Sequence, residues 1–149
     1  RHESAAKCAK LAAMLKLDHI GIAVSSIEQA RRFYENGLGL PAAPHVEEVA
    51  GERVRVLKLE CADPSHIELI EATSPDSAIA KFIEKRGPGL HHLCYQTHDI
   101  VADIARLKSL GFAPLWDAPR PGADGCLVMF FHPKETFGVL TELAQHPVK

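Results

Sequence analysis

The chain has 149 residues, the length of one domain or of two small halves that share a core. Hydrophobic residues make up 46% and charged residues 24%, which excludes a disordered or collagen-like chain. The formal net charge is -2, whereas a protein that mainly neutralises a nucleic-acid backbone has a clear basic excess. No apolar run approaches the roughly 18 residues that span a bilayer. We therefore expect neither nucleic-acid nor membrane partners.

The spacing of the cysteines and the number of histidines limit the kinds of metal or disulfide site that this chain can form. The cysteines are widely spaced, without a CxxC pair, which excludes a zinc cluster and a dense disulfide scaffold. Cys61, Cys94 and Cys126 lie among apolar residues, and this indicates buried thiols in a reducing compartment. Histidine occurs nine times, which is enough for a metal site if the placement is right.

The predicted elements of the first half begin after an Ala-rich segment. Residues 1–16 are interpreted as an N-terminal extension or leader, outside the functional domain. Ser74, Pro75 and Asp76 are predicted to cap a helix, with Pro75 at its first position, and Gly87 ends it. The apolar periodicity predicts, in order, a strand at 17–24, a helix at 27–35, strands at 54–60 and 66–71, and this capped helix to about 86.

The second half shows a similar order of elements. Gly111 terminates its helix, and residues 117–125 form a turn-rich loop. The patterns predict a strand at 90–97, a helix at 99–110, and strands at 113–116, 126–131 and 139–144.

Laying one half on the other indicates an internal repeat. At an offset of 73 residues, His19 falls on His92, each in the first strand of its half. At an offset of 74 residues, Glu68 falls on Glu142, each in the last strand of its half. A unit of one strand, one helix and further strands cannot bury a full core alone, so we expect the two halves to pair.

His19, Glu68, His92 and Glu142 are therefore candidate metal ligands. Imidazole and carboxylate suit divalent first-row ions, and four ligands leave positions open on a five- or six-coordinate ion. His91 points to the other strand face and is expected to pack or to support His92. His66 shares a strand face with Glu68, but its repeat partner is Leu140, which cannot ligate a metal, so Glu68 ranks above it.

The chain resembles the vicinal oxygen chelate superfamily and, within it, the methylmalonyl-CoA epimerases. The similar segments run from Leu17 to about Gln145 and include LDHIGIAV, SPDSAIAKFIEKRGPGLHHL and FFHPKETFGVLTEL. The resemblance implies an α+β domain over residues 17–145, in which two tandem βαβββ modules (about 17–86 and 90–145) pair into a curved, half-open mixed sheet around a metal site. The same four residues would hold the ion: Co²⁺ as the first choice, with Zn²⁺, Mn²⁺ or Ni²⁺ as the others.

The resemblance also implies a reaction, the interconversion of the 2R and 2S epimers of methylmalonyl-CoA by 1,1-proton transfer through a metal-stabilised enolate. Such a reaction needs an acid/base group on each face of the planar intermediate. The resemblance implies that one base is the glutamate at the ligand position of the last strand, which is Glu142 in this chain. Val54 stands where some members have the other, so Glu52, two residues earlier, is the candidate, and Glu48 is a weaker one.

The CoA thioester also needs cations, and four are available for it: Arg53, Arg55, Arg120 and Lys134. The resemblance also implies a homodimer. It implies a cytoplasmic protein if the source is a bacterium and a protein of the mitochondrial matrix if the source is a eukaryote.

Two alternatives use the same fold. A glyoxalase-like lyase or isomerase acting on a glutathione hemithioacetal would use the same ligand set. A non-catalytic small-molecule-binding protein is the alternative from another class, and bound metal would discriminate against it.

Overall fold

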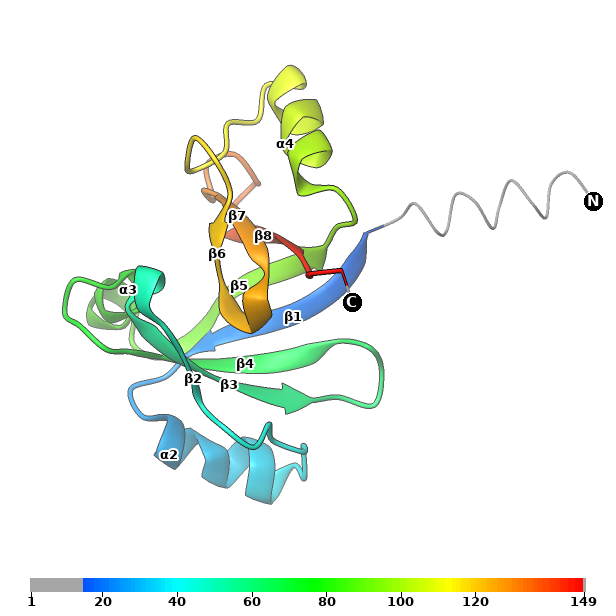
Figure 1. Ribbon diagram of the computed structural model, residues 1–149. Helices are drawn as coiled ribbons and strands as arrows, with labels where there is room; N and C mark the ends of the chain where they lie inside the picture. Colours follow the sequence, from blue (N-terminus) through cyan, green and yellow to red (C-terminus); the bar gives the residue numbers. More distant parts are fainter. Residues whose placement is uncertain (1–14, 149) are drawn as a thin grey trace, which may run out of the picture.

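The computed structural model describes residues 15–148, which form a single eight-stranded mixed sheet and three α-helices (Figure 1). The expected N-terminal extension lies outside the described residues except for its last two positions. None of the described helices is long and apolar enough to cross a membrane. The strands are β1 (Lys16–Ala23), β2 (Glu47–Val49), β3 (Val54–Glu60), β4 (His66–Ala72), β5 (Gly89–Gln96), β6 (Arg120–Pro121), β7 (Leu127–Phe131) and β8 (Thr141–Gln145), and the helices are α2 (Ile27–Arg31), α3 (Ala78–Arg86) and α4 (Ile100–Ser109).

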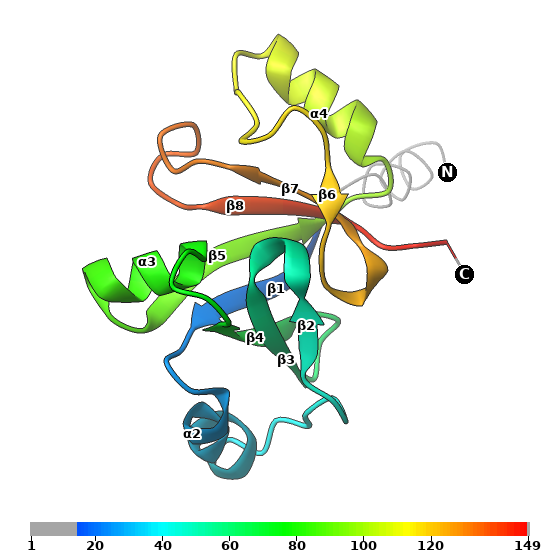
Figure 2. The same cartoon turned by 60° about the vertical axis from the view of Figure 1, so that its left-hand side comes forward.

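The strand order β2-β3-β4-β1-β5-β8-β7-β6 has the symmetry that the repeat predicts. In the first half β1 pairs in parallel with β4, and in the second half β5 pairs in parallel with β8. The two halves meet where β1 and β5 pair antiparallel, at the centre of the sheet. The predicted α+β architecture, with two paired modules in one curved sheet, is confirmed (Figure 2).

Strand alternation divides the side chains between an outer and an inner face of the sheet. The outer face of β3 and β4 packs under α2, through Leu57, Leu59 and Leu69. The outer face of β7 and β8 packs under α4, through Met129 and Leu143. The inner face is free of these two helices, and the functional residues described below lie on it.

The helix α3 lies at the end of the central strands, where it contacts β4, β1 and β5. Its Ile79 packs into the inner-face core with Val54, Val56 and Ile70. The helix begins at Ser77, whose hydroxyl accepts a hydrogen bond from Ala80 N at 3.0 Å. The predicted cap at Ser74–Asp76 is therefore wrong, because those residues form a turn that precedes the cap.

Other boundaries also differ from the sequence prediction. The helix predicted at 27–35 is α-helical only to Arg31 and continues as a wide π-helical turn over Arg32–Gly37. The strand predicted at 113–116 is absent, because Pro114 has no N–H group and only Leu115 N bonds to β7, at Phe130 O. The edge strands β2 and β6 were not predicted. They have three and two residues respectively, which is too short to show the alternation of apolar and polar side chains by which a strand is recognised.

Candidate metal centre

The four residues predicted as ligands lie on the inner face of the four central strands. His19 is on β1, Glu68 on β4, His92 on β5 and Glu142 on β8. Their exposed fractions are 5%, 8%, 4% and 6%, so all four are buried. Each histidine faces a small residue across the junction of the halves, because His19 opposes Cys94 and His92 opposes Gly21.

Three of the four converge on one point. His19 Nε2 lies 3.1 Å from His92 Nε2 and 3.1 Å from Glu142 Oε1, and His92 Nε2 lies 3.0 Å from the same oxygen. Two atoms bound at right angles to one ion, at about 2.1 Å each, are about 3.0 Å apart. The triangle of ligand atoms therefore has the size that a divalent first-row ion requires.

The hydrogen bonds around this triangle also fit a bound ion. Among the described residues, Glu142 Oε1 is the buried side-chain oxygen without a hydrogen bond of acceptable geometry. His19 Nδ1 lies 2.7 Å from Asp18 Oδ2, and His92 Nδ1 lies 2.9 Å from His91 Nδ1. With a proton on each Nδ1, both histidines keep the Nε2 lone pair for a metal.

Glu68 occupies the other side of the His19 ring. Its Oε2 lies 3.2 Å from His19 Nδ1 and 2.8 Å from His66 Nε2. His66 is itself buried beside His19 on the neighbouring strand, with ring centroids 5.0 Å apart. Glu68 therefore lies beside the triangle formed by the other three, with its Oε2 in contact with His19 and His66.

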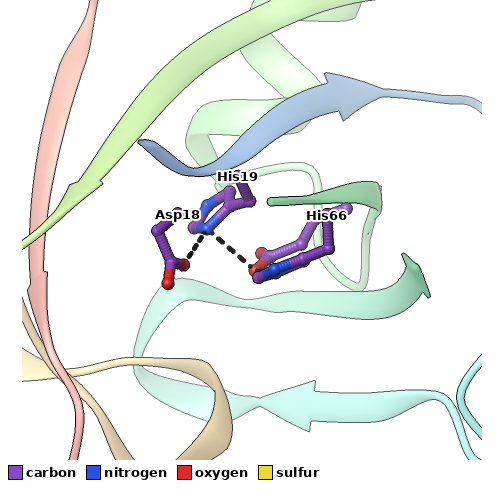
Figure 3. A group of neighbouring side chains, drawn as sticks. Asp18, His19 and His66 are labelled. Carbon is purple, nitrogen blue, oxygen red and sulfur yellow. Dashed lines mark hydrogen bonds and ion pairs between the residues drawn. The ribbon is translucent and has the colours of Figure 1, made fainter. Parts of the chain in front are cut away.

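Asp18 is a site residue that the sequence analysis missed. Neighbouring residues on a strand normally point to opposite faces, so regular strand geometry would turn Asp18 away from His19. The pairing of β1 with β5 skips a residue between Leu17 and His19, which is a β-bulge. The bulge lets Asp18 share the side of His19 and hydrogen-bond to its ring (Figure 3).

The C-terminal segment holds Asp18 in turn. His146 Nε2 lies 2.7 Å from Asp18 Oδ1, and His146 Nδ1 lies 3.4 Å from the Cys126 sulfur. The second oxygen of Asp18 is thus occupied by a residue 128 positions away. From the sequence, only the position of Asp18 next to His19 could have marked Asp18 as a site residue.

Negative charge dominates the cluster, because Asp18, Glu68 and Glu142 are all buried there. Burial by itself lowers the pKa of His19, but the hydrogen bond to Asp18, the contact with Glu142 and the nearby Glu68 charge raise that pKa to about 10. Burial by itself raises the pKa of Glu142, but its contacts with His19 and His92 lower that pKa to about 2. The carboxylates therefore favour a cation among them, which is a proton on His19 when no metal is bound.

His91 supports His92 as expected, but it does not point to the other strand face. The pairing of β5 with β1 skips His91 between His92 and Leu90, and His91 lines the same pocket as His92. Burial, and then the neighbouring His92, lowers the pKa of His91 to about 4, so its imidazole is neutral at physiological pH. A neutral His91 can accept the Nδ1 proton of His92. Its ring also packs edge-on against Phe82 of α3, with centroids 5.0 Å apart.

A pocket of about 310 Å³ opens beside the cluster and is lined by Glu68, His92 and Glu142. Glu52 also lines it, at the end of a short 3₁₀ turn over Ala50–Glu52. Burial raises the pKa of Glu52, and the Glu142 charge raises it further. The predicted second base thus lies in the same pocket as three of the four predicted ligands. Glu48 is exposed and does not line this pocket.

The cations considered for CoA have different surroundings. Arg53 pairs with Asp76 at 3.6 Å, and Arg55 pairs with Glu71. The Arg120 guanidinium stacks 4.1 Å from the centroid of the Trp116 ring and lines the pocket. Lys134 is exposed and does not line this pocket.

The fold and site place the chain in a known class of proteins. The family model of the glyoxalase/bleomycin resistance protein/dioxygenase superfamily matches residues 18–130. The chain belongs to this superfamily.

Within the superfamily, the chain is similar to methylmalonyl-CoA epimerases. It is 40% identical over 133 residues to the ethylmalonyl-CoA/methylmalonyl-CoA epimerase of Cereibacter sphaeroides, covering 87% of this chain and 97% of that protein. It is 42% identical over 132 residues to an uncharacterized protein of Bacillus subtilis, covering 89% of this chain and 93% of that protein. The mitochondrial methylmalonyl-CoA epimerase of Homo sapiens is 35% identical over 131 residues, covering 87% of this chain and 73% of that protein.

The structure is also similar to solved structures of methylmalonyl-CoA epimerases. A methylmalonyl-CoA epimerase in complex with methylmalonyl-CoA and NH4+ superposes with a TM-score of 0.86 at 36% identity, covering 91% of this chain and 96% of that chain. The methylmalonyl-CoA epimerase of Mycobacterium tuberculosis superposes with a TM-score of 0.85 at 34% identity, covering 89% of this chain and 88% of that chain.

Proposed function

We propose that this protein is a divalent-metal-dependent epimerase that interconverts the 2R and 2S epimers of methylmalonyl-CoA. The observation that carries the proposal is the convergence of His19 Nε2, His92 Nε2 and Glu142 Oε1 on one point, beside a pocket that Glu52 also lines. The similarity to proteins named methylmalonyl-CoA epimerases supports the choice of substrate.

The donor set supports the choice of ion. Two imidazoles and a carboxylate suit Co²⁺ first, with Zn²⁺, Mn²⁺ and Ni²⁺ as the others, and Glu68 is the fourth proposed ligand. When bound, such an ion acts as a Lewis acid that makes the carbon between the thioester and the carboxylate more acidic.

The chain's own contribution is the movement of the proton. One carboxylate removes the proton from C2 and the other returns a proton to the opposite face, so each turnover inverts the centre without net loss of a proton. We assign these two roles to Glu142 and Glu52. The raised pKa of Glu52 supports its role, because a base whose pKa lies nearer to neutrality accepts and releases a proton more readily.

The pocket supports a substrate with a small alkyl branch. Apolar side chains line much of it, among them Val49, Val54, Ile70 and Phe130. One relative is named for ethylmalonyl-CoA as well as methylmalonyl-CoA, so we include ethylmalonyl-CoA as a second substrate to be tested.

The test is solvent deuterium incorporation at C2 of methylmalonyl-CoA, followed by NMR with added Co²⁺ and again after chelation. We expect metal-dependent exchange together with conversion of one epimer into the other. Exchange without inversion would mean that only one base works and would remove Glu52 from its role. Absence of exchange in metal-loaded protein would reject the epimerase and favour the glyoxalase-like alternative, which turnover of a glutathione hemithioacetal would then establish.

We further propose that the protein is a homodimer, as was expected from its family. Light scattering coupled to size-exclusion chromatography measures this directly, and a monomeric mass at micromolar concentration would contradict it.

A further inference from the structure

A small cavity lies beside His19 and is distinct from the pocket of the metal centre. Asp18, His19 and His66 line this cavity but not the pocket, whereas Glu68 and Glu142 line both. Its volume is about 40 Å³, and a polar cavity of roughly 10–15 Å³ already has room for one water molecule. We call it the His66 cavity, and it has room for a small ion.

Four buried residues offer ligand atoms at this cavity, and one atom from each lies within 4.8 Å of the other three: Asp18, His19, His66 and Glu68 (Figure 3). His19 Nδ1 lies 2.7 Å from Asp18 Oδ2 and 3.2 Å from Glu68 Oε2, and His66 Nε2 lies 2.8 Å from the same Glu68 oxygen. Ligand atoms on a tetrahedral zinc ion, at about 2.0–2.1 Å from the metal, are about 3.3 Å apart. A small widening of the cluster therefore makes the site.

These atoms are different from the ones that the metal centre uses. His19 offers Nδ1 here, whereas its Nε2 faces His92 and Glu142. Glu68 contacts His19 and His66 through Oε2, which leaves Oε1 for its proposed role in the metal centre. Asp18 keeps Oδ1 for His146 and offers Oδ2. An ion in the His66 cavity therefore competes for none of the atoms that hold the first ion.

Charge also favours a second cation. Asp18, Glu68 and Glu142 are buried carboxylates, and one divalent ion neutralises only two of them. A second divalent ion that replaces the Nδ1 proton makes His19 an imidazolate. The positive charges of the two ions then equal the negative charges of the three carboxylates and this ring.

We propose that the His66 cavity binds a second divalent first-row cation, best matched by Zn²⁺, which the His19 ring bridges to the ion of the metal centre. Its ligands are Asp18, His19, His66 and Glu68. On binding, the Nδ1 proton of His19 passes to solvent. The first ion, on Nε2, favours this loss because it withdraws electron density from the ring, so the second ion binds after the first. Four protein ligands leave a tetrahedral ion without an open position, so this ion is structural and ties β1 to β4.

The inference rests on the proposed function for the first ion, and metal stoichiometry tests it without an activity assay. Native mass spectrometry and calorimetric titration of metal-free protein with Zn²⁺ should give two ions per chain. His66→Leu should bind one ion, because Leu140 stands at the equivalent position of the second half and cannot ligate a metal. His45→Leu is the matched control, since His45 is exposed before β2 and should leave both ions bound.

The outcomes separate the second ion from the first. One ion in the wild type overturns the second site and leaves the proposed metal centre standing, whereas no bound ion rejects both. Two ions in His66→Leu, with wild-type affinities, would place the second ion elsewhere and overturn the assignment.

A measurement on the wild type does not depend on how the variants fold. Two Cu²⁺ ions joined by one imidazolate are magnetically coupled, and electron paramagnetic resonance of protein loaded with two Cu²⁺ per chain detects this. Two independent Cu²⁺ signals would overturn the bridge through His19.

Discussion

Gly21 on β1 lies directly opposite His92 on β5, and the ring of His92 occupies the space that a side chain at position 21 would need. A Cβ atom built on Gly21 would lie 2.8 Å from His92 Nε2 and closer still to Cε1 and Nδ1 of the same ring. The glycine thus allows this ring to lie flat against the sheet and reach Glu142. Cys94 has the equivalent place opposite His19 in the other half.

Gly21→Ala is therefore expected to displace the ring of His92 and to weaken metal binding at least tenfold. Metal content after dialysis and titration calorimetry measure the effect. Gly37→Ala is the control, because its added methyl group meets its nearest atom, Arg32 O, at an ordinary 3.4 Å. Unchanged affinity in the Gly21 variant would show that His92 does not need this space.

His92→Ala is expected to abolish metal binding and activity, because it removes one of the three converging ligand atoms. His98→Ala serves as the matched control, since His98 is exposed in the loop after β5. Elemental analysis of the purified proteins gives the metal content. Full stoichiometry in the His92 variant would reject the ligand assignment.

Asp18→Asn is expected to lower metal affinity by about 10- to 100-fold, the usual cost of losing a group that orients a ligating histidine. An amide can present its NH₂ group to His19 Nδ1 and favour the wrong tautomer, which leaves Nε2 protonated. Calorimetric titration with Co²⁺ measures the change. Asp117→Asn, in the exposed loop before β6, should bind the ion as the wild type does. The same affinity in both variants would remove Asp18 from the site.

Glu52→Gln is expected to slow turnover by about 10²- to 10⁴-fold, the range for a general base, while the metal stays bound. Glu48→Gln is the control, because Glu48 is exposed on β2 and does not line the pocket of the metal centre. The rates come from the epimerisation assay at saturating substrate. If only the Glu48 variant lost activity, Glu48 and not Glu52 would be the second base.

Thiol reactivity tests the burial of the inner face. Burial raises the pKa of Cys94, and it raises the pKa of Cys126 to about 12, whereas Cys61 is partly exposed. Since a raised pKa leaves little thiolate at pH 8, iodoacetamide should add one group to a Cys8→Ser protein, at Cys61. Mass spectrometry of the intact protein and of its peptides locates the adduct. Rapid modification of Cys94 would mean that the centre of the sheet opens to solvent.

The repeat made much of the candidate metal centre predictable. His19 and His92, like Glu68 and Glu142, occupy equivalent positions in two similar halves, and a duplicated unit folds into two similar substructures. The alternation of side chains along each strand then places each of them on a face without knowledge of the partner strand. For the same reason the strand at 54–60 was predicted with the bounds that β3 has.

Other parts of the site depend on contacts between distant segments. The bulge that turns Asp18 toward His19 arises in the pairing of β1 with β5, and His146 reaches Asp18 from the C-terminal segment.

Local periodicity and the repeat thus determined which residues are candidates and which strand faces carry them. The tertiary structure alone decided which of these atoms meet, because a bulge, a glycine opposite a ring and a parallel strand pair are relations between segments far apart in the chain. Such relations leave no pattern in a short window of sequence, since the free energy that selects them comes from the assembled sheet.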